Sequence, residues 1–283
     1  MASSTSRSMT GFLGGQRAVH ILSPRNFQYA CCVSGILCAL FFLFAFVASG
    51  FIAPIKPYWT AEQTLHHFQT HEGGIQTGAA LMLISGMLYL PLTAAISAQM
   101  RRIPNLHYAV SALQLASGAA GIFTFMMPAM ILATAVFRLD RPAEITQLMT
   151  DFFWITALMP WPTFMTQNFA FAYAILIDQR PHPLFPKFMA VINIAVPILF
   201  VPAIAMHCTK TGPLAWNGGL TFWTAGSLFC SQLVIDSICL FFAIRSEPVG
   251  GEKIVDMFPN TLPHADDKIE SGESVPNGSS ESS

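Results

Sequence analysis

Three acids and a glutamine recur at helical spacing in the middle of the chain. Asp140, Glu144, Gln147 and Asp151 follow one another at steps of four, three and four residues. Side chains at this spacing point in one direction from a helix, so they would form a single polar stripe. A carboxyl group at the edge of an apolar layer holds its proton more firmly than one in water and can donate it as a general acid.

Asp151 is the leading candidate for this acid. Three aromatic residues follow it directly, at Phe152, Phe153 and Trp154, and they open a long apolar segment. An ionisable side chain beside hydrocarbon is costly unless it is partnered or functional. We therefore predict that Asp151 lies at or inside a membrane boundary and takes part in proton transfer.

Asp140 and Glu144 are predicted as partners of, or alternatives to, this acid. Pro142 suits the first turn of a helix, which predicts an N-cap at Asp140 or Arg141. In a purely structural interpretation Asp140 caps the helix, Glu144 complements its dipole, and Arg138 and Arg141 pair with both acids at the surface.

A second polar group lies in the connection that ends at Glu72, where Glu62, His66, His67 and His71 precede it. His67 and His71 are one helical turn apart, a geometry that can hold a metal ion. The chain offers no third ligand in a matching pattern, so we predict no metal site. Glu72 stands at the mouth of an apolar stretch and is a fourth candidate acid, with a helix-start role as the alternative.

Six further residues are predicted to bind a substrate. Three tryptophans would line or cap an apolar site, and three amide side chains would orient its ligand. They are Trp154, Trp161, Trp216, Gln167, Asn168 and Asn217. Two prolines flank Trp161 and free backbone carbonyl groups, and irregular backbone inside a membrane is tolerated only beside protein or a cavity.

Six long stretches without charge position these residues. They cover 26–55, 73–100, 103–137, 152–177, 188–209 and 211–235. Each exceeds the roughly 20 residues that a helix needs to cross a hydrocarbon layer about 30 Å thick. With 53% hydrophobic and 10% charged residues, the chain is predicted to be an all-α, polytopic integral membrane bundle of about six transmembrane helices. The number of transmembrane helices is larger if the long stretches, or the connection at 56–72, insert into the membrane separately.

The basic residues predict the orientation of this bundle. Six spans put both termini on one face together with most of the fourteen lysines and arginines, leaving Lys56, Arg138, Arg141 and Lys210 on the other. This bias predicts cytoplasmic termini, and we expect a multi-pass protein of the endoplasmic reticulum.

The chain divides into a membrane body and two tails. We predict a cytoplasmic N-terminal segment at 1–26, a transmembrane catalytic domain at 27–245 and a disordered acidic tail at 246–283. The formal net charge of −1 indicates no nucleic-acid partner. Membrane lipid is the expected surrounding, and nothing in the sequence identifies a protein partner.

Acids above an aromatic, apolar pocket are suited to cation chemistry. A protonated carboxyl group can donate to an alkene or an epoxide, and aromatic faces stabilise the carbocation that forms. Cyclisation of a prenyl chain is a reaction of this kind, and its substrate is itself soluble in lipid. The chain has no Asp-rich motif for binding diphosphate, so ionisation by loss of diphosphate is not expected.

Three short segments carry a resemblance to a known family. They are Phe51-Ile52-Ala53-Pro54, Arg138-Leu139-Asp140-Arg141-Pro142 and Lys210-Thr211-Gly212-Pro213-Leu214-Ala215-Trp216-Asn217-Gly218. They resemble segments of the fungal membrane-bound terpene cyclases of ascochlorin, ascofuranone and macrophorin-type meroterpenoid pathways, over about residues 46–245. The resemblance implies proton-initiated cyclisation of a farnesyl chain on an aromatic or quinol-type head group, from a terminal epoxide or alkene. It implies no metal or redox cofactor and assigns no catalytic residue.

Two other classes of function remain open. Six spans could form two inverted halves of a small transporter around a midplane site. Against this interpretation, the chain shows no internal repeat, and Asp236 is the only clear candidate for an acid deep in the membrane that could couple to transport. A membrane assembly protein without a reaction is the third interpretation. Loss of activity in Asp151→Asn with normal accumulation of the protein would argue against it.

Overall fold

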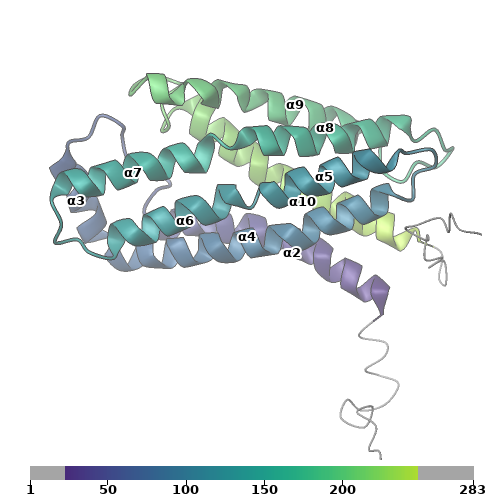
Figure 1. The fold of residues 1–283 in the computed structure, drawn as a ribbon, viewed down its shortest axis with the longest axis horizontal. Coiled ribbons are helices and arrows are strands. Elements are labelled where there is room, and N and C mark those ends of the chain that lie inside the picture. The colour runs from purple at the N-terminus through teal and green to yellow at the C-terminus, as the bar shows by residue number, and fades with distance from the viewer. Residues whose placement is uncertain (1–22, 248–283) are drawn as a thin grey trace, which may run out of the picture. The chain divides into compact units, whose positions relative to one another are not determined.

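The computed structural model describes residues 23–247, and the regular structure in this range is entirely helical. Figure 1 shows the helices. They are α2 (Pro24–Ala48), α3 (Ala61–Thr70), α4 (Glu72–Met100), α5 (Tyr108–Ala120), α6 (Phe123–Val136), α7 (Ala143–Leu158), α8 (Trp161–Ile177), α9 (Phe188–Leu199) and α10 (Ala225–Arg245). A 3₁₀ helix, η2 (Val201–Cys208), follows α9, and a π-helix, η3 (Gly219–Thr224), leads into α10.

The prediction of a helical membrane bundle is confirmed. Five segments are long and apolar enough to cross a bilayer. They are Pro24–Ala48, Glu72–Met100, Tyr108–Val136, Phe188–Cys208 and Gly219–Arg245. The remaining predicted stretch, 152–177, falls on α7 and α8, which pack along α6 and α5 respectively and so follow the same course as a span.

Successive crossings of the bundle alternate in direction, so the connections between crossings fall at one of its two ends (Figure 1). The terminal end holds the start of α2, the end of α10 and the connections α4 to α5 and α8 to α9. The α3 end holds α3 and the connections α6 to α7 and η2 to η3. Within the bundle α2 packs against α4 and α10, α4 packs against α6, and α8 packs against α9.

Local sequence explains where the first helices begin and end. The Ser23 hydroxyl oxygen accepts from the backbone N–H of Asn26 at 3.2 Å, and proline follows at the first helical position. Gly50, with a φ of +69°, turns the chain just past the end of α2. The first predicted stretch therefore ends seven residues early as a helix, at Ala48 rather than at residue 55.

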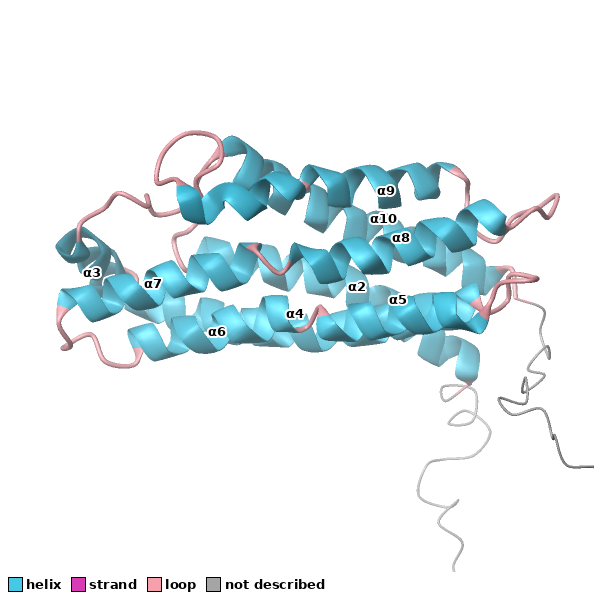
Figure 2. Ribbon diagram, turned by 45° about the horizontal axis from the view of Figure 1, so that its top comes forward, coloured by secondary structure: helices cyan, strands magenta, loops and turns pink. Residues whose placement is uncertain are grey.

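Two of the crossings are broken, as Figure 2 shows by short loops between α5 and α6 and between α7 and α8. The first break falls at Gly121 and Ile122, and the second at Met159 and Pro160. Glycine weakens a helix, and proline removes a backbone donor. The side chain of Thr163 donates to the Pro160 carbonyl at 2.9 Å, which satisfies this backbone group at the break.

The predicted N-terminal segment 1–26 and acidic tail 246–283 lie almost wholly outside the described residues. The catalytic-domain range 27–245 lies within them.

Candidate functional site

The breaks in the helices meet around one pocket. Gly121 contributes from the α5–α6 break, Pro160 from the α7–α8 break, Phe200 from the end of α9, and Gly226 from the start of α10. The pocket is lined by Phe42, Tyr89, Gly121, Thr124, Phe125, Ala157, Leu158, Pro160, Trp161, Thr163, Phe164, Phe200, Ala225, Gly226 and Phe229. Its free volume is about 60 Å³. This space takes a few atoms, so a whole prenyl chain requires the lining side chains to move apart.

The wall of the pocket is aromatic. Phe42 lies against Phe125 and Phe229 with ring centroids 5.3 and 5.6 Å apart, and Phe164 lies 5.3 Å from Phe229. The angles between these ring planes are 73°, 67° and 64°. A pocket bounded by rings in edge-to-face contact presents π-faces in several directions, which can attract a cation formed within it.

Aromatic contacts continue from the pocket to the α3 end. Phe46 lies 5.1 Å from Phe42 and 6.1 Å from Trp154. Trp154 in turn stacks on Trp216 at 6.3 Å with an angle of 9° between the planes. The indole N–H of Trp216 donates to the carbonyl oxygen of Ile55 at 2.8 Å, which fixes this ring beneath the loops.

The three predicted substrate-binding tryptophans therefore lie in two places, the pocket wall and the aromatic cluster beside it. Trp161 lines the pocket. Trp154 and Trp216 are buried at 0% and 8% exposure in the neighbouring aromatic cluster. Asn217 is partly buried in the loop beside Trp216. Sequence reasoning did not single out the phenylalanines of the wall, because apolar rings spread over four helices carry no local pattern.

A buried polar layer borders the pocket on the side of the terminal end. The Tyr89 hydroxyl, whose ring lines the pocket, donates to the side-chain carbonyl of Gln167. The amide groups of Gln167 and Gln114 both donate to the hydroxyl of Thr93, at 3.1 and 3.0 Å. Gly118 permits this contact, because a methyl group there would lie 2.0 Å from the same hydroxyl oxygen. Tyr89 and Thr93 were not predicted, since single polar residues within an apolar stretch give no signal of convergence.

The layer continues through amides to Asp236. Asn168 donates to the backbone carbonyl of Phe164 at 2.7 Å and accepts from Gln232. Gln232 also donates to Asn193 at 3.0 Å, and Asn193 donates to the Asp236 carboxyl at 3.4 Å. Asp236 is 6% exposed. The predicted pair Gln167 and Asn168 thus lies in this layer. Gln167 belongs to the group around Thr93, and Asn168 to the group that runs from the Phe164 carbonyl to the buried acid Asp236.

Asp151 lies on the opposite side of the pocket. It is partly buried in α7, and this burial raises the pKa of its carboxyl group above the usual range, an effect that the positive charge of Lys210 opposes. Leu158, which lines the pocket, follows it by two helical turns on the same face. Asp151 is therefore about 10 Å from the pocket along the axis of α7, toward the α3 end.

The other acids predicted on the stripe are exposed. Glu144 lies in the first turn of α7, and Asp140 lies in the preceding loop rather than on the helix. The N-cap prediction is wrong, because Pro142 occupies that position and α7 begins at Ala143. Among the described residues no ion pair joins these acids to the two nearby arginines. The Gln147 amide donates to the Trp59 carbonyl in the loop before α3, at 2.9 Å.

Glu72 is also exposed, at the first residue of α4, and accepts from the Gln76 amide at 3.4 Å. Within residues 23–247 no hydrogen bond connects it to Asp151. This arrangement matches the helix-start interpretation of Glu72. The structure brings only Asp151 of the four predicted acids to a partly buried position.

His67 and His71 stack on each other, with ring centroids 4.3 Å apart. The His67 ring nitrogen Nε2 hydrogen-bonds the Ser49 carbonyl at 3.2 Å, and His71 Nδ1 contacts the His67 carbonyl at 3.1 Å. Burial lowers the pKa of His67, so the neutral ring donates to Ser49 and ties α3 to the end of α2. No group of three possible metal ligands occurs in the described part of the chain.

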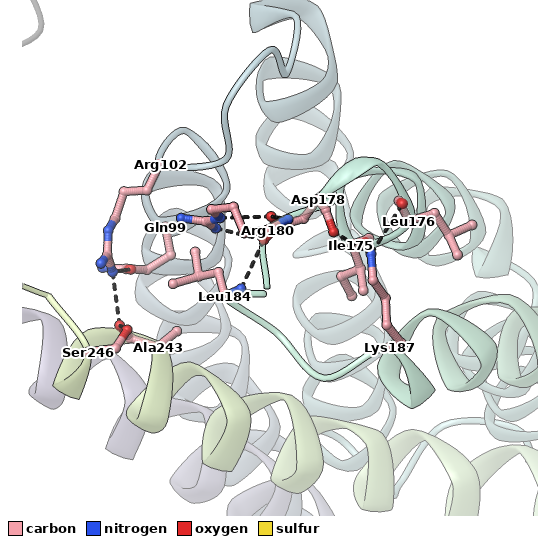
Figure 3. Close-up of polar contacts among 10 residues, drawn as sticks. All are labelled: Gln99, Arg102, Ile175, Leu176, Asp178, Arg180, Leu184, Lys187, Ala243 and Ser246. Atoms are coloured by element: carbon pink, nitrogen blue, oxygen red, sulfur yellow. Dashed lines mark hydrogen bonds and ion pairs between the residues drawn. The ribbon is translucent and has the colours of Figure 1, made fainter. Parts of the chain in front are cut away.

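A separate polar cluster at the terminal end closes α8 (Figure 3). Arg180 donates to both carboxylate oxygens of Asp178, at 2.7 and 2.6 Å, which holds the pKa of Asp178 at about 2. Lys187 donates to the carbonyls of Ile175 and Asp178, each at 2.6 Å. These contacts satisfy the last carbonyl groups of the helix, so the cluster has a structural role.

No family model matches the chain, and neither the curated proteins nor the solved structures contain a significant match.

Proposed function

We propose that this protein is a membrane-bound terpene cyclase acting on a lipophilic prenylated aromatic or quinol-type compound. The observation that carries the proposal is the position of Asp151. A partly buried carboxyl group lies on the same face of α7 as the wall of an aromatic pocket within a membrane bundle. The resemblance to meroterpenoid cyclases in three segments supports the same reaction.

Asp151 is the proposed general acid. Its O–H bond breaks as the proton passes to the oxygen of a terminal epoxide, and the C–O bond opens to leave a tertiary carbocation. Successive alkenes attack this centre and form C–C bonds, while the aromatic wall stabilises the migrating charge. Loss of a proton from a carbon beside the last cation forms an alkene. The product is an isomer of the substrate. Protonation of a terminal alkene also gives an isomer, because the proton added at the start is lost at the end.

The apolar lining of the pocket favours this class of reaction. A carbocation in water is captured at once, whereas an apolar cavity gives the internal alkenes the first opportunity to react. Glu144 lies on the Asp151 face of α7 and is exposed, so it offers a path by which Asp151 regains its proton from the aqueous side. Asp140 and Glu72, both exposed, have supporting roles at most.

We also propose that the protein resides in the endoplasmic reticulum with both termini in the cytoplasm. Among the described residues, six of the ten lysines and arginines lie at the terminal end. Those six are Arg25, Arg101, Arg102, Arg180, Lys187 and Arg245. Glycosylation acceptor sites introduced into the 209–218 loop would be modified in this orientation and would stay unmodified in the reverse one.

Product analysis tests the proposed reaction. Membranes from a host expressing the protein receive a farnesylated phenol or its terminal epoxide. The extracts are then analysed by chromatography and mass spectrometry. A cyclised product of unchanged mass is expected from the wild type and is lost in Asp151→Asn, whereas Asp140→Asn retains it. If membranes containing the wild-type protein leave both substrates unchanged, the cyclase proposal fails.

A small transporter is the second candidate, and the buried Asp236 is the observation that favours it. An acid sealed among helices can couple proton movement to a solute. Proteoliposomes separate the two functions, because a transporter moves a prenylphenol or a proton across the bilayer without changing the compound, whereas a cyclase isomerises it.

A further inference from the structure

Three buried polar atoms in the helix interior have no hydrogen-bond partner among the described residues. They are the indole Nε1 of Trp154 and the side-chain carbonyl oxygens of Gln114 and Gln232. The other two unpaired buried atoms, in Arg25 and Ser49, lie at the two ends of α2. A buried polar group without a partner is destabilising, so a ligand group that reached one of these atoms would supply the missing hydrogen bond.

The three atoms lie on opposite sides of the pocket. Trp154 precedes the pocket residue Leu158 by four residues on α7, toward the α3 end. Gln232 follows the pocket residue Phe229 by three residues on α10, toward the terminal end. Gln114 precedes Gly121 by seven residues, also toward the terminal end. The α3 side therefore offers a donor, and the terminal side offers two acceptors.

The donor also shares a face with the acid. Trp154 follows Asp151 by three residues, so both side chains project from α7 in similar directions. An N–H group here can hydrogen-bond an ether-type oxygen such as that of an epoxide, whereas it has no partner on a plain alkene. The Gln114 and Gln232 carbonyls can accept only from a donor, such as a phenolic hydroxyl.

We infer that the substrate lies along the bundle, with a hydroxylated ring beside Gln114 and Gln232 and its chain terminus, a terminal epoxide, beside Trp154 and Asp151. The inference rests on the proposed function and adds the direction of binding and the reactive group. Between the two sides the chain lies against Phe42, Phe46 and Phe229, which are in ring contact. Trp154 is a positioning residue in this arrangement.

Photoaffinity labelling tests the direction without requiring turnover. Two farnesylphenol probes carry a diazirine, one at the chain terminus and the other on the ring, and labelled peptides of the wild-type protein are mapped by mass spectrometry. The chain-end probe is expected to label α7, and the ring probe α5 and the half of α10 nearest the terminal end. Labelling in the reverse positions, or labelling that excess unlabelled farnesylphenol does not reduce, would overturn the inference.

Two substitutions test the hydrogen-bonding groups separately. Methylating the phenol should lower kcat/KM of the wild type by about 10-fold, and Gln232→Leu should remove most of this discrimination. Trp154→Phe should reduce the preference for the epoxide over the alkene by a similar factor. Gln76→Leu, on the exposed start of α4, is the matched control and should keep both preferences.

The outcomes separate this inference from the proposed function. Cyclisation by the wild type with no response to methylation or to Trp154→Phe would overturn the orientation and leave the cyclase intact. Oriented labelling without any cyclised product would overturn the proposed cyclase activity and leave the direction of binding intact.

Discussion

Asp151 and Asp236 are acids at similar distances from one pocket and in contrasting surroundings. Each precedes or follows a pocket residue by two helical turns, Asp151 toward the α3 end and Asp236 toward the terminal end. Asp151 is partly buried and lies near the charge of Lys210, whereas Asp236 is buried and accepts from Asn193. An acid that turns over must regain its proton from water. The comparison therefore supports our proposal of Asp151 as the general acid, and we expect Asp236 to organise the amide layer.

The largest expected effect separates the two acids by activity. Asp151→Asn removes the donated proton and should reduce the rate of cyclisation by about 10²- to 10⁴-fold. Asp236→Asn keeps a group that can accept from Asn193 and should reduce the rate by less than about 10-fold. Initial rates of product formation on equal amounts of folded protein measure both. Equal losses in the two variants would remove the distinction drawn between these acids.

Substitution of Asp236 should reduce stability more than substitution of Asp151, the reverse of their expected effects on activity. Asp236→Leu leaves an Asn193 amide hydrogen without its carboxyl partner inside the bundle and should cost about 1–3 kcal/mol. Asp151→Leu, at a partly buried position, should change stability by less than about 1 kcal/mol. Thermal unfolding in detergent compares them. A lower midpoint for the Asp151 variant than for the Asp236 variant would contradict this account of the polar layer.

Gly118 tests how closely the polar layer is packed. In Gly118→Ala the new methyl group would meet the Thr93 hydroxyl at 2.0 Å, and we expect a loss of about 1–2 kcal/mol as α5 moves away from α4. Gly73→Ala is the control, because nothing lies within 4 Å of its added methyl group and alanine favours a helix. A stable Gly118 variant with unchanged activity would show that the layer tolerates separation of these helices.

The smallest effect concerns the dependence of activity on pH. A general acid is active while protonated, so activity should fall as the pH rises through the pKa of Asp151. Lys210 lowers that pKa, and Lys210→Met should therefore move the alkaline limb of the profile to higher pH. Lys56→Met, another exposed lysine in an α3-end connection, should leave the limb in place. A shift to lower pH, or equal shifts in both variants, would refute this electrostatic coupling.

The sequence predicted the crossings better than their interruptions. Stretches of 22 or more uncharged residues identify membrane helices because the bilayer imposes both length and apolarity. The same criteria do not locate a break, since Gly121 and Pro160 have counterparts such as Gly86 and Pro91 that lie inside the continuous α4. Whether a glycine or proline interrupts a helix depends on the neighbours that satisfy the freed backbone groups.

The candidate site was predicted where its signals are local. Asp151 was identified by its position before an aromatic run, and Gln167 and Asn168 by their adjacency after two prolines. Tyr89 and Thr93 were missed because their partners lie more than 20 residues away on other helices. Asp140, Glu144 and Glu72 are exposed in the structure, which the sequence did not indicate, since spacing alone does not distinguish a stripe that faces water from one that faces a pocket.

The most direct test of the central claim is the structure of the protein with a bound saturated farnesylphenol, which has no alkene to protonate. Electron cryomicroscopy should show its chain between the α5–α6 and α7–α8 breaks, against Phe42 and Phe229, with the lining side chains moved apart. Density for the chain only on the lipid-facing surface, with the pocket closed around its aromatic wall, would contradict the assignment of this pocket as the site of cyclisation.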